Sequence, residues 1–165
     1  DGTRMAYRMH TDYLHQLYLN NDLAEGRYVA NGEQVSLSDV TVPMFVVGTE
    51  TDHVAPWRSV YKVGKLVRSK DYTFCLTSGG HNAGIISEPG HPNRSYRMDC
   101  RPAHGAWVEH GQWARQAPQH EGSWCTAWHA WLAARSSRVR RAKPIPANAA
   151  LGDAPGEYVR QRYSD

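Results

Sequence analysis

The chain has 165 residues, a net charge of +3, and 41% hydrophobic and 10% aromatic residues. This length suffices for one domain with a sizeable apolar core. No stretch resembles a signal peptide or a membrane span. The cysteines Cys75, Cys100 and Cys125 are widely spaced, which excludes a disulfide framework and favours a reducing cytosol. Because C-x-x-C and H-E-x-x-H are both absent, we expect no metal site.

Positive charge is concentrated at the C-terminal end. Residues 135–165 contain seven Lys/Arg against three Asp/Glu, whereas residues 1–134 contain twelve against thirteen. Such a run either contacts nucleic acid or another anionic surface, or forms a solvated linker. Neither aromatic interleaving nor a nucleic-acid motif accompanies it. We therefore interpret residues 135–165 as a basic linker and tail, and we expect no nucleic-acid partner.

The N-terminal segment is predicted to hold a helix and a hairpin. Apolar residues at helical spacing over residues 7–23 predict the helix, with one apolar stripe that includes Tyr7, Leu14, Leu17 and Tyr18. The pair Asn31-Gly32 supplies the positive φ angles of a tight turn, so residues 27–37 are predicted to form the hairpin.

A β-α-β unit is predicted next. The short apolar run at residues 42–48 is typical of a buried strand in a parallel sheet. Pro56 can open a helix, and residues 57–68 have the pattern of an amphipathic crossover helix. Residues 72–77 form the second apolar run. Strand, helix and strand in this order predict parallel strands joined by a right-handed crossover.

The rest of the chain shows a weaker pattern. Residues 87–122 contain four prolines and many polar residues, which predicts a loose segment with Trp107 and Trp113 as isolated anchors. A final helix is expected to begin near Ser123, a good N-cap. Its apolar residues recur at the spacing of a core face: Trp124, Trp128, Trp131 and Leu132.

An acid and a histidine each follow one of the two predicted strands. Asp52 lies four residues after Gly48, and His81 lies four residues after Thr77. Catalytic groups in open α/β sheets gather beyond the carboxyl ends of the strands, so both side chains should project from that edge. A carboxylate can fix the tautomer of an imidazole, whose other nitrogen then takes a proton from a nucleophile. Acid followed by histidine is also the order of the last two members of an α/β-hydrolase triad.

Each of these residues also has a structural interpretation. Asp52 could cap a helix, and His81 could be a structural loop histidine. His53 could hydrogen-bond the carboxylate or the substrate, or be an ordinary loop residue. Trp57 could line a substrate channel or pack its helix. Asn82 could donate from its amide within the loop or simply face solvent.

No residue of this chain is placed to be the nucleophile. Cys75 lies inside an apolar strand and is interpreted as a small buried hydrophobe. Cys125 lacks the second glycine of a G-x-C-x-G elbow and follows the acid and the base, which is the wrong order for a triad of this kind.

These motifs resemble the C-terminal part of bacterial polyhydroxyalkanoate synthases. Residues 52–57, D-H-V-A-P-W, resemble the family's D-H-[IV]-x-P-W acid loop. Residues 78–85, S-G-G-H-N-A-G-I, resemble its S-G-H-x-A-G-[IV] histidine loop, with one extra glycine. The similarity is close over residues 4–98 and looser over residues 120–134.

The resemblance implies a partial α/β-hydrolase fold, in which parallel strands with crossover helices follow the end of a cap. Residues 1–37 would be the end of the cap, and residues 38–134 would be the C-terminal half of the catalytic domain. The nucleophilic cysteine, the oxyanion hole and the first strands are then expected upstream of Asp1. We expect the isolated fragment to be inactive and the interrupted sheet to expose an unpaired edge.

The implied activity is that of an acyltransferase, which polymerises 3-hydroxyacyl-CoA into polyester and releases CoA. By matching position, His81 would activate the cysteine thiol, Asp52 would orient His81 or help activate the 3-hydroxyl, and His53 would support them. The implied partners are 3-hydroxyacyl-CoA, the nascent polyester, the surface of cytoplasmic polyester granules and a second copy in a homodimer. No cofactor is expected, because acyl-CoA is a substrate.

Two other functions remain open. The chain could belong to an esterase or depolymerase of the same fold with a serine nucleophile upstream, or to a non-catalytic relative that binds polyester granules. The D-H-x-x-P-W motif favours the synthase, but the upstream elbow is what separates these alternatives.

Overall fold

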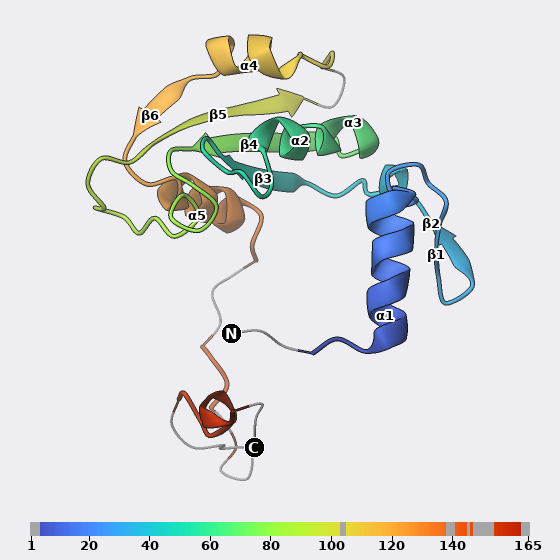
Figure 1. The fold of residues 1–165 in the computed structure, drawn as a ribbon. Helices are drawn as coiled ribbons and strands as arrows, with labels where there is room; N and C mark the ends of the chain where they lie inside the picture. Colours follow the sequence, from blue (N-terminus) through green and yellow to red (C-terminus); the bar gives the residue numbers. More distant parts are fainter. Residues whose placement is uncertain (1–3, 103–104, 138–140, 145, 147–153, 163–165) are drawn as a thin grey trace.

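The computed structural model describes residues 4–102, 105–137, 141–144, 146 and 154–162 (Figure 1). The described residues form a mixed α/β structure that contains a four-stranded sheet and a separate two-stranded hairpin. The α/β expectation is therefore confirmed. None of the described helices combines the length and apolarity needed to cross a membrane. The predicted boundaries at residues 37 and 134 stay predictions.

The four-stranded sheet is mixed, with one parallel and two antiparallel strand pairs. Its strands lie in the order β3 (Met44–Thr49), β4 (Asp71–Thr77), β5 (Ser95–Pro102) and β6 (Gln119–Glu121). The β3–β4 pair is parallel, as the β-α-β order predicted, whereas the β4–β5 and β5–β6 pairs are antiparallel, so the sheet is not built from parallel strands alone. No helix lies in residues 78–94, between β4 and β5, and a return without a crossover reverses the strand direction.

The two faces of β4 support two separate cores. Tyr72, Phe74 and Leu76 pack against α2 (Trp57–Tyr61) and α4 (His110–Gln116). Cys75 faces the opposite side, where it packs with Tyr96 and with the beginning of α5 (Cys125–Ala134). This alternation is the two-residue period of a strand that is buried on both faces. Helices therefore cover the sheet on both sides (Figure 1).

The predicted crossover helix is broken into two short helices. The chain forms α2 and then α3 (Val63–Leu66), which meet at Lys62, and Pro56 precedes the first helical residue. Gly64 of α3 lies directly against two aromatic side chains. A Cβ atom at this position would lie 2.9 Å from Trp107 Cζ3 and 2.9 Å from Tyr72 Cζ. The small residue lets α3 approach the aromatic core.

The N-terminal helix exists, but it is not packed as its spacing suggested. It consists of α1 (Tyr7–Asp12) and a π-helical segment, η1 (Tyr13–Leu19), so it ends before residue 23. Neither segment contains a buried residue, and Tyr7 and Tyr18 are 85% and 78% exposed. Most of the apolar stripe is therefore exposed in the part of the chain that the structure describes.

The predicted hairpin is confirmed. Strands β1 (Tyr28–Ala30) and β2 (Glu33–Val35) pair antiparallel across a turn in which Asn31 and Gly32 have φ angles of 52° and 85°. A short 3-10 helix, η2 (Leu37–Asp39), follows and leads toward β3.

The segment expected to be loose contains three regular elements, so that expectation was wrong. Residues 87–122 include β5, α4 and β6. The prolines lie where they do not interrupt them: Pro102 ends β5, and Pro118 directly precedes β6. Helix α4 has its own N-cap, because the Glu109 carboxylate accepts a hydrogen bond from the Gly111 amide at 2.9 Å.

The final helix is confirmed, but its predicted core face is only partly buried. Ser123 Oγ accepts from the Cys125 amide at 3.1 Å, as an N-terminal cap does. Trp124 is buried, whereas Trp128 and Leu132 are 42% and 37% exposed. Beyond α5 the described part of the tail includes the 3-10 helix η4 (Tyr158–Arg160), while much of the predicted basic run lies outside the described residues.

Replacing Gly64 with alanine should destabilise the protein by about 1–3 kcal/mol, because the added methyl group overpacks the cluster of Trp107 and Tyr72. Gly111→Ala is the matched control. It is also helical, and the nearest atom to its added Cβ is Arg115 Nη1 at 3.8 Å, so helix propensity should make it neutral or stabilising. Urea unfolding of both variants measures the difference, and equal effects would contradict the packing described.

Candidate active site at the end of the parallel strand pair

The parallel strands deliver two loops to the same edge of the sheet. The last β3–β4 pair joins Thr49 and Thr77. Backbone pairing then continues past the strands, since the Glu50 amide donates to the Thr77 carbonyl and the Thr51 amide donates to the Gly79 carbonyl, each at 3.0 Å. The acid loop and the histidine loop therefore leave the sheet side by side.

Asp52 is held by hydrogen bonds at both carboxylate oxygens. Oδ1 accepts from the amides of Val54 and Ala55, each at 2.8 Å. Oδ2 accepts from His81 Nδ1 at 2.9 Å and, more weakly, from Thr49 Oγ1 at 3.3 Å. The Asp52 side chain is only 7% exposed. Its orientation is thus fixed by its own loop and by the histidine loop.

These contacts keep Asp52 ionised. The Ala55 amide bond is the largest cause that lowers the pKa of Asp52, and His81 and the Val54 amide lower it further. Partial burial opposes them, and the net effect takes the pKa from 3.8 to about 2. At neutral pH the group facing the imidazole is therefore a carboxylate.

His81 presents its second nitrogen away from this carboxylate. An ionised carboxylate only accepts hydrogen bonds, so Nδ1 carries the proton in the 2.9 Å contact. Nε2 makes no hydrogen bond to any of the described residues, and the side chain is 47% exposed. In the neutral imidazole, Nε2 is thus an available base. Oriented imidazole with an accessible Nε2 is the arrangement that removes a proton from a nucleophile.

The histidine loop fits against β3 because of Gly84. The Gly84 amide donates to the Gly80 carbonyl at 2.8 Å and closes a turn that contains His81. A Cβ atom on Gly84 would lie 2.5 Å from Thr49 Cγ2, closer than side-chain atoms approach one another. A larger residue would push the turn away from β3, the strand that leads to Asp52.

The side chains of the other predicted site residues form no hydrogen bond with the Asp52–His81 pair in the described part of the chain. His53 is exposed, and its side chain makes no hydrogen bond within the described residues. Asn82 is also exposed, and its contribution comes from the backbone, where its carbonyl accepts from the Ile85 and Ile86 amides. Trp57 is buried at 8% exposure, with its ring 5.7 Å from His110 in an edge-on contact, so its surroundings are those of a core residue.

Thr49 was missed by the sequence analysis. Its side chain is buried at the end of β3 and contacts Asp52 Oδ2. The sequence feature that could have identified it is a hydroxyl residue at the end of an otherwise apolar strand, three positions before Asp52.

The cysteines are not part of the Asp52–His81 arrangement. Cys75 is fully buried, and burial raises the pKa of its thiol to about 12, so it is unreactive at neutral pH, as expected. Burial also raises the pKa of the Cys100 thiol. None of the three thiols hydrogen-bonds Asp52 or His81 in the described part of the chain. Within those same residues, no group of three His, Cys, Asp or Glu side chains could hold a metal ion.

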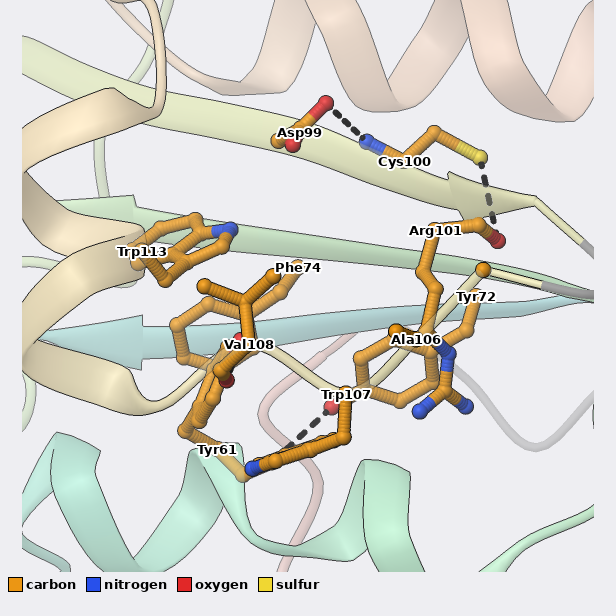
Figure 2. Close-up of a pocket in the computed structure, with 11 residues that line it drawn as sticks. Tyr61, Tyr72, Phe74, Asp99, Cys100, Arg101, Ala106, Trp107, Val108 and Trp113 are labelled. Carbon is orange, nitrogen blue, oxygen red and sulfur yellow. Dashed lines mark hydrogen bonds between the residues drawn. The ribbon is translucent and has the colours of Figure 1, made fainter.

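A cavity of about 120 Å³ lies elsewhere on the sheet (Figure 2). Its walls combine aromatic with polar side chains and include Tyr72 near the start of β4, whereas His81 follows the end of that strand. Tyr61 donates from its hydroxyl to the Val108 carbonyl at 2.9 Å, and burial raises the pKa of that hydroxyl to about 12. The cavity belongs to the aromatic core and is separate from the candidate site.

Asp52→Asn should lower stability in a pH-dependent way. The pKa of Asp52 is depressed in the folded state, so its stabilising effect is present above about pH 4 and is lost as the pH falls toward 2. Asparagine keeps an oxygen that can accept from the Val54 and Ala55 amides but carries no charge. Urea unfolding at a series of pH values should show the difference between wild type and Asp52→Asn shrinking over that range. A constant difference would contradict the assigned role of the charge.

The site residues lie in a chain that is similar to poly(3-hydroxyalkanoate) polymerases. No protein-family model matches the chain. It is 35% identical over 165 residues to the poly(3-hydroxyalkanoate) polymerase subunit PhaC of Rhizobium etli, covering 98% of this chain and 25% of that protein. It is 36% identical to the poly(3-hydroxyalkanoate) polymerase of Methylorubrum extorquens, with 98% and 26% covered, and 34% identical to PhaC of Cupriavidus necator, with 98% and 27% covered.

The chain thus spans about a quarter of the length of these relatives. The resemblance drawn from the acid and histidine loops is confirmed by similarity that extends over nearly all of the chain. This protein is accordingly homologous, over almost its whole length, to a segment of poly(3-hydroxyalkanoate) polymerases.

Proposed function

We propose that this chain is the C-terminal catalytic portion of a polyhydroxyalkanoate synthase with an α/β-hydrolase fold, and that Asp52 and His81 are its acid and base. The observation that carries the proposal is the 2.9 Å contact between Asp52 and His81 Nδ1 at the carboxyl edge of the parallel strands, with Nε2 available. The named relatives support polyester synthesis as the reaction.

In the proposed reaction, His81 Nε2 takes the proton of an upstream cysteine thiol. The thiolate attacks the carbonyl carbon of 3-hydroxyacyl-CoA, the bond to the CoA sulfur breaks, and the imidazolium returns the proton to that sulfur. His81 then removes the proton of a 3-hydroxyl group, whose oxygen attacks the carbonyl carbon of the enzyme thioester. The ester forms as the bond to the cysteine sulfur breaks, and the imidazolium returns the proton to that sulfur. Asp52 stabilises the imidazolium formed in both steps without taking a proton itself.

The unpaired side of β3 supports the proposed completion of the sheet. Within the described residues β3 pairs only with β4, which leaves its other edge without a partner. The strand nevertheless ends in two buried residues, and exposed edges of apolar strands are prone to pair with further chain. We propose that upstream strands complete an α/β-hydrolase sheet at this edge, and that residues 1–37 belong to a cap.

Exposed apolar side chains beside the site fit an apolar substrate. Val54 follows Asp52 in the acid loop and is 64% exposed, and Ile85 and Ile86 follow His81 and are 41% and 71% exposed. Such side chains can contact the alkyl groups of a hydroxyacyl unit or of the nascent polyester. The granule surface, the cytoplasmic location and the homodimer remain part of the proposal through the family resemblance alone.

The alternatives are weaker for specific reasons. A serine hydrolase could use the same Asp–His pair, but the relatives that match 98% of the chain are named as polymerases. A non-catalytic granule-binding relative has no need for a carboxylate whose four hydrogen bonds align a histidine. The intact pair therefore favours a working catalyst.

His81→Ala and Asp52→Asn should each lower the rate of CoA release from 3-hydroxyacyl-CoA by about a thousandfold or more in the protein that contains this chain. A thiol reagent measures the released CoA, and isolation of the product shows whether polyester or free hydroxy acid is formed. His129→Ala, an exposed histidine on α5, is the matched control and should retain full activity. Full turnover in both site variants would rule out the proposed roles, and free hydroxy acid as the product would favour the hydrolase.

A further inference from the structure

We infer that Trp124 is a positioning residue for His81, which it holds through the backbone of the histidine loop. The inference rests on the proposed function of the Asp52–His81 pair and adds a residue to it from a different element, at the beginning of α5. Trp124 is 7% exposed and is buried under the sheet, so it acts through the loop rather than through the substrate.

The contact is a buried hydrogen bond to the turn that contains His81. Trp124 Nε1 donates to the Gly84 carbonyl at 3.1 Å, and Thr77 Oγ1 makes a longer contact with the same oxygen at 3.4 Å. The Gly84 amide closes the turn onto the Gly80 carbonyl. The indole therefore holds the closing residue of the turn in which His81 lies.

A second contact ties the same loop to α5. Ser123 Oγ donates to the Ser87 carbonyl and also accepts from the Cys125 amide. Ser123 and Ser87 are both buried. The two consecutive residues directly before α5 thus donate hydrogen bonds to two carbonyls of the segment between β4 and β5, three and six positions after His81.

The indole is itself anchored to the strand that leads to the acid. Trp124 stacks on Phe45 of β3, with ring centroids 6.3 Å apart and an interplanar angle of 26°. The other end of β3 carries Thr49, against which Gly84 packs. Trp124 therefore fixes the loop that carries His81 relative to β3, the strand that leads to Asp52. It does so independently of the Asp52–His81 contact.

Loss of this bond should affect catalysis more than substrate binding. Small displacements of a catalytic group lower the rate of the chemical step strongly, while contacts to substrate stay intact. Trp124→Phe keeps an aromatic ring on Phe45 but removes the N–H donor. In the whole protein we expect kcat to fall by about tenfold, the equivalent of one hydrogen bond, and KM to change by less than about twofold.

Trp128→Phe is the matched control on the same helix. Trp128 is 42% exposed, and its indole nitrogen donates no hydrogen bond within the described residues. Its replacement should leave both kcat and KM unchanged. An equal loss of kcat in the two variants would show a general effect of altering α5 and would overturn the inference.

A second measurement separates this inference from the proposed function. In protein labelled with ¹⁵N-histidine, the exchange of the His81 Nδ1–H with solvent reports on the Asp52–His81 contact without any turnover. We expect Trp124→Phe to speed this exchange by about tenfold and Trp128→Phe to leave it unchanged. Unchanged exchange and unchanged kcat in Trp124→Phe would refute the inference, whereas activity retained in His81→Ala would refute only the proposed function.

Ser123→Ala covers the case in which Trp124→Phe does not fold, which urea unfolding would reveal. This variant removes the tie to Ser87 and leaves the indole in place. It should lower kcat and speed Nδ1–H exchange, as Trp124→Phe does, but by a smaller factor. No change in either quantity would show that contacts from the residues before α5 do not position His81, and it would overturn the inference where Trp124→Phe does not fold.

Discussion

The parallel pairing of β3 with β4 is the constraint on which the candidate site depends. Thr49 and Thr77 are paired at the ends of these strands. The loops that follow therefore leave the sheet at the same position along the strands and at the same edge. Asp52 and His81 are far apart in sequence, and this register brings their loops close enough for the two side chains to form a hydrogen bond. A slip of one residue would turn the side chains at the strand ends to the opposite faces.

Packing on both faces of the sheet stabilises this register. Phe74 and its neighbours pack against α2 and α4 on one face of the sheet. Cys75 packs in the core next to α5 on the other face. The core that contains Cys75 also positions the site, because its Trp124 donates a hydrogen bond to the histidine loop. The same residues thus serve the core and the site.

The sequence was sufficient for the local parts of this structure and insufficient for the long-range ones. The apolar runs predicted β3 and β4, and the position of Asp52 and His81 after them predicted the site, because strand direction follows from a β-α-β order. The antiparallel β5 was not predictable in this way, since its ladder depends on contacts with β4 rather than on its own pattern. Likewise, nothing local pairs Trp124 with Gly84, and helical spacing at Tyr7 could not show whether a surface covers it.

The hydrogen bonds to the Asp52 carboxylate limit the number of protons that the proposed site could move. Two amides and an imidazole hold this group in its ionised form down to about pH 2, so it is a very weak base. A carboxylate of that kind would not deprotonate a hydroxyl group directly, and it would not receive the proton that reaches the imidazole. In the proposed reaction, only one proton would then move at any stage, and His81 alone would carry it. The acylation of the cysteine and the transfer of the acyl group to the hydroxyl would then depend on the same imidazole. The two steps would have to occur one after the other in the same site.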